Sequence, residues 1–117
     1  ASPSVLGFDL VLAADVVYDP SALPGLVSTL ADALGRRASD DVARPPCRAL
    51  IASERRSDDT WAAFVAHLSL HRLHISSDFS DEARAVCAAQ THFFCAPETL
   101  ERMVLVELVA ANEAVAL

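Results

Sequence analysis

The chain contains no lysine: all nine of its basic residues are arginines, and sixteen acidic residues bring the net charge to −7 over 117 residues. A protein that binds the phosphate backbone of a nucleic acid needs a basic face, which this balance does not favour. We therefore expect no nucleic-acid partner.

Glycine, cysteine and long apolar runs are also scarce. The three glycines, Gly7, Gly25 and Gly35, form no G-x-G pattern. No apolar run approaches the roughly 18 residues of a membrane span, and no basic segment precedes an apolar one as in a secretion signal. An odd number of cysteines without a secretory context indicates a reduced protein. The sequence thus predicts a cytoplasmic protein with no membrane partner.

Hydrophobic residues, by contrast, make up 53% of the chain, which is enough for one domain with a buried core. Segments typical of β-strands lie near residues 8–14, 48–53, 71–76 and 102–110. The first is a continuous apolar run, the pattern of a strand that is buried on both faces of a sheet. The third alternates between apolar and polar residues, which is typical of an edge strand.

Helical patterns separate these strands. The first helical pattern follows Pro20 and has one apolar stripe, which consists of Leu23, Leu26, Val27, Leu30 and Leu34. Gly35 stands where the C-terminal cap of this helix is expected. Ser57 can cap a second helix, whose apolar stripe consists of Trp61, Phe64, Val65 and Leu68. Residues 81–90 form a weaker helical pattern. This order predicts an α/β fold with parallel strands. We expect the last strand to run antiparallel to the first two, between the second and the third.

Asp15 and Tyr18 follow the point where the first strand should end. Ligands of open α/β sheets bind outside the carboxyl ends of the strands, so polar residues at such a position are candidates for function. The alternative is structural: Asp15 would cap the following turn and Tyr18 would pack on the helix. The strand before the pair and the helix after it favour the functional interpretation.

The segment Ala13–Tyr18 resembles the acidic-x-x-aromatic motif of protein-lysine methyltransferases that use S-adenosylmethionine. The order of elements resembles the C-terminal half of their seven-stranded, Rossmann-like class I sheet. The nearest resemblance is to the elongation factor 2 lysine methyltransferase family, and it is carried by Ala13 to Tyr18 with Pro20, by Arg56 followed by Thr60 and Phe64, and by residues 94–108.

The resemblance implies an S-adenosyl-L-methionine cofactor and a protein substrate, elongation factor 2. Asp15 would accept hydrogen bonds from the lysine amine, and Tyr18 would line the lysine channel. Ala13 and Ala14 would contact the cofactor. Because the Gly-rich cofactor loop has no counterpart, residues 1–117 would form a partial domain, strands four to seven, whose partner is the missing N-terminal half. The early core strand and the absence of an initiator Met also suggest a piece of a longer protein.

The sequence is also compatible with two other functions. The chain could be a non-catalytic fragment or degenerate paralogue that serves as an interaction module, or a methyltransferase for another protein or a small molecule. The roles of Arg55, Arg56 and Glu107 are also open. The arginines follow a strand end, where they could meet an acidic group or form a surface ion pair, and Glu107 could face the site or water.

The sequence also contains two groups of potential metal ligands. Cys87, His92 and Cys95 have a spacing that could suit zinc, but a fourth ligand is missing. His67 and His71 lie one helical turn apart without the adjacent glutamate of a zinc protease motif. We therefore predict no metal site.

Overall fold

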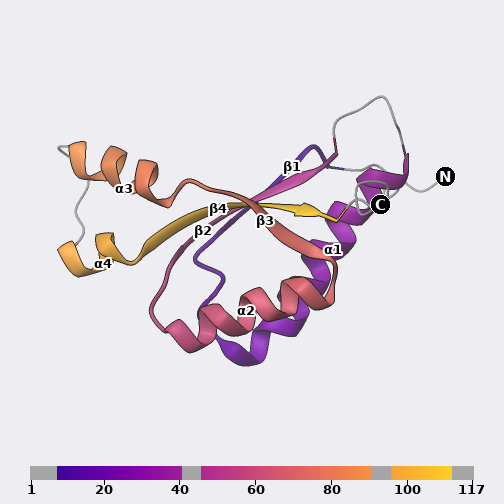
Figure 1. Cartoon of the computed structure of the whole chain (residues 1–117), viewed down its shortest axis with the longest axis horizontal. Helices are drawn as coiled ribbons and strands as arrows, with labels where there is room; N and C mark the ends of the chain where they lie inside the picture. The colour runs from indigo at the N-terminus through magenta and orange to yellow at the C-terminus, as the bar shows by residue number, and fades with distance from the viewer. Residues whose placement is uncertain (1–7, 41–45, 91–95, 112–117) are drawn as a thin grey trace.

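The computed structural model describes residues 8–40, 46–90 and 96–111. In these ranges a four-stranded sheet is covered on one side by two long helices (Figure 1). The strands are β1 (Leu10–Ala14), β2 (Arg48–Glu54), β3 (Leu73–Asp78) and β4 (Met103–Ala110). The helices are the short 3-10 helix η2 (Pro20–Ala22) and the α-helices α1 (Leu23–Asp40), α2 (Asp58–Leu70), α3 (Ser80–Ala89) and α4 (Pro97–Glu101).

The strands lie in the order β1-β2-β4-β3. β1 is parallel to β2, and β4 is antiparallel to both of its neighbours, β2 and β3. The predicted α/β class, the insertion of the last strand and the edge position of the third strand are therefore confirmed. The observed strands begin within two residues of the predicted starts.

Helix α1 packs its apolar stripe against the sheet, and four of the five predicted stripe residues are at most 3% exposed: Leu23, Val27, Leu30 and Leu34. The prediction that Gly35 ends this helix is wrong, because α1 continues to Asp40. Gly35 does not have the positive φ of a C-terminal cap. The residues after it, two arginines and an alanine, favour helix and carry α1 onward.

Helix α2 begins as the sequence predicts. The backbone N–H of Thr60 donates a hydrogen bond to Ser57 Oγ at 3.2 Å, and two aspartates occupy the first turn, where the helix dipole favours anions. Phe64 and Leu68 are buried in the core, and the half-buried ring of Trp61 lies 5.3 Å from that of Phe64. Trp61 therefore has the core-packing role expected for an aromatic residue on this stripe. The prediction that Val65 belongs to the buried stripe is wrong, because this side chain is 40% exposed.

Helix α3 confirms the weak helical pattern near residues 81–90 and packs against the beginning of β4, whereas α4 was not predicted. Arg84 Nη1 donates to the Met103 carbonyl at 2.7 Å, and the Leu105 N–H donates to Ser80 Oγ at 3.0 Å. Hydrogen bonds from Ser80 hold the pKa of Asp78 below its usual value.

The two faces of the sheet differ. The face toward α1 and α2 carries the core, with Ile51, Val106 and Leu108 at most 1% exposed. On the opposite face, which we call the open face, Leu10 is 40% and Leu12 71% exposed. The prediction that the first strand is buried on both faces is therefore wrong for the part of the chain that the structure describes. The apolar side chains of β1 are partly buried on the core face only.

Candidate functional site

The candidate site lies where β1 and β2 end side by side. Ala13 and Ala14 close β1 and pair with residues of β2, and Asp15 follows them directly. The Asp15 N–H donates to the Ala52 carbonyl at 2.6 Å, so the parallel ladder holds this residue too. Its φ of 56° lies in the left-handed region, which aspartate tolerates better than most residues other than glycine. Asp15 thus occupies a defined backbone position at the carboxyl end of the parallel pair.

The Asp15 carboxylate meets a charged group from the neighbouring strand. Arg56 Nη2 lies 3.4 Å from Asp15 Oδ2, and Arg56 Nε lies 3.2 Å from Glu54 Oε1. Glu54 is the last residue of β2, so the guanidinium group joins the ends of two strands. The side chains of Asp15 and Arg56 are 58% and 53% exposed, which leaves both accessible to a ligand.

Residues other than Asp15 and Tyr18 cap the turn after β1 and pack this segment against the core. Asp19 caps the turn: its Oδ1 accepts hydrogen bonds from the Ser21 N–H at 3.0 Å and the Ser21 hydroxyl at 2.8 Å. Val17, which is 4% exposed, anchors the segment in the core, while Tyr18 is 60% exposed. Asp15 and Tyr18 are therefore available at the surface, three residues apart, at the end of β1.

The two alanines differ in their surroundings. Ala13 packs against the core, whereas Ala14 is exposed on the open face. A side chain that is only a methyl group lets a flat ligand approach the strand end closely. The described glycines, Gly25 and Gly35, both lie in α1 and have no positive φ, so the described residues contain no Gly-rich loop of the kind that binds a cofactor.

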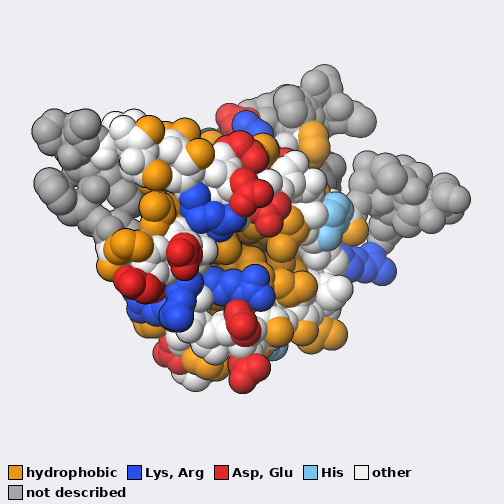
Figure 2. Space-filling view, turned by 60° about the vertical axis from the view of Figure 1, so that its left-hand side comes forward, with side chains coloured by type: hydrophobic (Ala, Val, Ile, Leu, Met, Phe, Trp, Pro, Cys, Tyr) orange, Lys and Arg blue, Asp and Glu red, His pale blue; other side chains and the backbone are white. Residues whose placement is uncertain are grey.

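A second arginine stands beside the first but has different contacts. Arg55 Nε pairs with Asp58 Oδ1 at 3.0 Å, and the Arg55 N–H donates to the Arg102 carbonyl at 2.7 Å. Figure 2 brings forward the end of the sheet at which β2 leads into α2; there, arginines and carboxylates are interspersed with exposed apolar side chains. The charges at this end are therefore of both signs.

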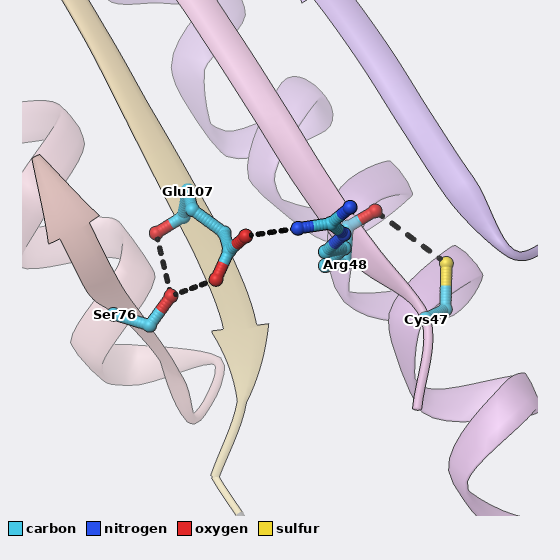
Figure 3. A network of polar contacts seen from close by, with 4 residues as sticks. All are labelled: Cys47, Arg48, Ser76 and Glu107. Carbon is cyan, nitrogen blue, oxygen red and sulfur yellow. Dashed lines mark hydrogen bonds and ion pairs between the residues drawn. The ribbon is translucent and has the colours of Figure 1, made fainter. Parts of the chain in front are cut away.

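Glu107 belongs to a separate network on the open face (Figure 3). Its Oε2 accepts from Arg48 Nη1 at 2.7 Å and its Oε1 from the Ser76 hydroxyl at 2.8 Å. The hydrogen bond from Ser76, followed by that from Arg48, holds the pKa of Glu107 below its usual value. Arg48 begins β2 whereas Glu54 ends it, a separation of about 20 Å at 3.3 Å per residue. Glu107 therefore joins three strands and is not part of the candidate site.

Three of the candidate metal ligands, Cys87, His67 and His71, lie among the described residues. Cys87 is half-buried in α3, with its Sγ 3.9 Å from Met103 Sδ, whereas His92 and Cys95 lie outside the described residues. His67 and His71 stand at the end of α2. Within the described ranges, no three His, Cys, Asp or Glu side chains gather as a metal site would require. The same ranges contain no helix that is both long and apolar enough to cross a membrane.

Comparison with known proteins adds one family. A family model described as lysine methyltransferase matches residues 3–69, which is more than half of the chain. The match includes β1, α1, β2 and nearly all of α2, and with them Asp15, Tyr18 and Arg56. No curated protein matches the chain significantly.

Proposed function

Because the chain belongs to the lysine methyltransferase family, we propose that it forms the lysine-binding half of a protein-lysine N-methyltransferase that uses S-adenosylmethionine and acts on elongation factor 2. The observation that carries the proposal is the Asp15 carboxylate, fixed by the backbone at the carboxyl end of the parallel strands and exposed there. The cofactor follows from the family's reaction. The substrate rests on the resemblance of the motif Ala13–Tyr18 and the residues after it.

The chemistry sets clear demands on the protein. The bound cofactor supplies a methyl group on a positively charged sulfur, and the lysine amine must present its lone pair to that carbon. Only the neutral amine has a lone pair, so the protein must hold it deprotonated and aligned. A carboxylate at a strand end can accept the N–H hydrogen bonds of the amine and thereby aim the lone pair. We assign this role to Asp15, and the released proton passes to water.

The neighbouring residues fit the two other roles. Tyr18 is 60% exposed beside Asp15, so its ring can form one wall of a channel for the aliphatic part of lysine. Ala14, exposed on the open face, and Ala13 before it would contact the cofactor at the end of β1.

The open face supports the proposal that residues 1–117 form a partial domain. Leu10 and Leu12 expose apolar side chains on β1, which among the described strands lies at the edge of the sheet. Proteins commonly cover exposed apolar surface beside a strand edge with another element or a partner. We propose that an N-terminal half with the Gly-rich cofactor loop is that layer. On this basis residues 1–117 alone should show no binding of S-adenosylmethionine by calorimetry, and micromolar binding would contradict it.

The same observation favours one alternative function. A chain with an apolar open face and no cofactor loop of its own could serve as an interaction module without catalysis. Activity of the intact protein, the chain together with its N-terminal half, separates the two functions. An interaction module would retain partner binding when Asp15 is changed, whereas the enzyme would lose its rate.

The test is Asp15→Asn in the intact protein. Asparagine tolerates the left-handed backbone conformation, so the substitution preserves the fold and removes the charge. Its NH2 group also presents donors to an amine that needs acceptors. We expect methylation of elongation factor 2 to fall about a hundredfold, the usual effect of losing one well-aimed polar contact in a transition state. Cofactor affinity, measured by calorimetry, should not change.

Asp19→Asn is the matched control. It changes the same residue type four positions away, and asparagine caps a turn as well as aspartate does. We expect the control to keep nearly full activity. An unchanged rate for Asp15→Asn, together with a loss of thermal stability, would show that Asp15 is only structural.

A further inference from the structure

We propose that Arg56 is a positioning residue that offsets the charge of Asp15, so that the carboxylate orients the substrate amine without holding it in the protonated form. The inference rests on the proposed function, since it concerns the same carboxylate. It assigns a role to a residue that the sequence alone left between a surface ion pair and a ligand contact.

The role of Asp15 contains a physical conflict. A carboxylate close to a lysine amine stabilises the ammonium form and raises the pKa of the lysine. The ammonium form has no lone pair and cannot accept a methyl group. An isolated carboxylate at this position would therefore orient the substrate and inhibit it at the same time.

Arg56 is placed to remove this conflict. Its Nη2 lies 3.4 Å from Asp15 Oδ2, so a positive charge stands directly beside the negative one. Only one carboxylate oxygen of Asp15 is in this pair, which leaves the other oxygen and further lone pairs to accept from the amine. Arg56 thereby reduces the net negative charge that the carboxylates of Asp15 and Glu54 would otherwise present to the amine.

The position of the guanidinium group is fixed from the side of β2. Arg56 Nε lies 3.2 Å from Glu54 Oε1, and the Arg56 N–H donates to the Glu54 carbonyl at 3.0 Å. Glu54 is the last residue of β2, the strand beside β1. Its contacts with Arg56 therefore hold the guanidinium group next to Asp15 at the end of β1. Of the other charged groups near this end, Arg55 pairs with Asp58, and Asp19 accepts hydrogen bonds from Ser21. The guanidinium of Arg102 is a further positive charge on the strand side, where the Arg102 carbonyl accepts from the Arg55 N–H.

The size of the effect follows from the exposure of the pair. Both side chains are more than half exposed, so solvent weakens their fields. We expect loss of the Arg56 charge to raise the pKa of the bound lysine by about half a unit to one unit. Near neutral pH this lowers the neutral fraction of the amine, and hence kcat/KM, by about threefold to tenfold.

The test compares Arg56→Gln with Arg55→Gln in the intact protein, using kcat/KM for a lysine-containing substrate between about pH 6.5 and 10. The two arginines are adjacent and similarly exposed, but Arg55 pairs with Asp58 instead of Asp15. We expect the acidic limb of the profile to move to higher pH for Arg56→Gln only, with the rate recovered at high pH. Arg56→Lys keeps the charge and should restore the original limb.

A double substitution provides a second readout. If Arg56 acts through its charge, then Arg56→Gln should move the acidic limb by a similar amount in the Asp15→Asn background, because the effects of separate charges on the pKa of the amine add. Thermal unfolding of each variant verifies that the fold is retained. A merely structural Arg56 would lower the rate equally at every pH and in both backgrounds.

The outcomes separate the inference from the proposed function. Equal pH profiles for Arg56→Gln and Arg55→Gln, in a protein whose parent methylates lysine, would overturn the role of Arg56 and leave the role of Asp15 intact. Absence of lysine methylation by the unsubstituted intact protein would overturn both. A shifted limb with rescue by Arg56→Lys would support both.

Discussion

Replacing Glu107 by glutamine should destabilise the sheet in a manner that depends on pH. Glu107 lies in the middle of β4 and accepts hydrogen bonds from Ser76 of β3 and Arg48 of β2, so one carboxylate joins three strands (Figure 3). Its side chain is only 14% exposed, whereas that of Arg48 is 55% exposed. The bond to Ser76 is therefore the stronger contribution, and solvent weakens the ion pair with Arg48.

The magnitude follows from these two contacts. A hydrogen bond to a charged group contributes about 1.5–3 kcal/mol, and an exposed ion pair contributes up to about 1 kcal/mol. Glutamine keeps one acceptor oxygen, so only part of this sum is lost. We expect the free energy of unfolding at pH 7 to fall by about 1–2 kcal/mol, which lowers the melting temperature by roughly 5–15 °C in a domain of this size.

The pH dependence identifies the charge as the cause. The folded-state pKa of Glu107 lies below its usual value of 4.5, so the stabilisation is fully present above 4.5 and is lost as the pH falls through the folded-state pKa. The difference between parent and Glu107→Gln should therefore be largest near neutral pH and shrink below pH 4.5. Asp78, whose pKa is also lowered, contributes equally to both proteins and cancels.

The measurement is urea unfolding of residues 1–117 and of Glu107→Gln at pH 7 and at about pH 3, at a protein concentration at which light scattering shows both to be monomeric. Glu101→Gln, an exposed change at the end of α4, is the control and should have little effect at either pH. A destabilisation of the same size at both pH values would refute the reasoning. It would mean that the glutamine disturbs packing and that the carboxylate charge contributes nothing.

Three further outcomes are expected. Gly35→Ala should raise the free energy of unfolding by about 0.5–1 kcal/mol in urea denaturation, because the residue is helical and an added Cβ meets nothing within 4 Å; destabilisation would mean that the helix ends there after all. Ser57→Ala should lower it by about 1 kcal/mol through loss of the cap on α2, whereas Ser57→Asp should not. Residues 1–117 should self-associate in light scattering, and Leu12→Glu should reduce the association more than Leu70→Glu. The two leucines are similarly exposed, at 71% and 77%, but Leu12 lies on the open face and Leu70 on α2. A monodisperse parent chain would contradict the partial-domain proposal.

The elements that the sequence predicted correctly are those with a local physical cause. Apolar runs located the strands, the stripe from Leu23 to Leu34 located α1, and Ser57 marked the start of α2. The end of α1 could not be located in this way, because Gly35 is compatible with both a cap and a helix interior. Which of them forms depends on the good helix formers that follow.

The candidate site was predictable in position but not in its contacts. The end of an apolar run drew attention to Asp15, and the resemblance gave it a role. The partner of Asp15 is Arg56, 41 positions along the chain, and no local pattern reports that pairing. It depends on the register of β1 against β2, which also places Asp15 beside Ala52. The exposure of Leu12 was missed for a related reason: an apolar strand looks the same whether its second face is covered or open.

The central position of β4 has a consequence for how the chain acquires its structure during synthesis. β4 is the last of the described strands in the sequence, yet it lies between β2 and β3, and β3 has no other strand neighbour among the described residues. Of the described strand pairs, only β1–β2 can form before β4 has been synthesised. Until then, the backbone hydrogen-bonding groups along the β4-facing edges of β2 and β3 stay unpaired. Pairing of β2 with β4 closes a loop of about fifty residues, and such long-range contacts form slowly. A premature stop codon before Met103 would therefore remove the middle of the sheet and leave two separate pieces prone to aggregation.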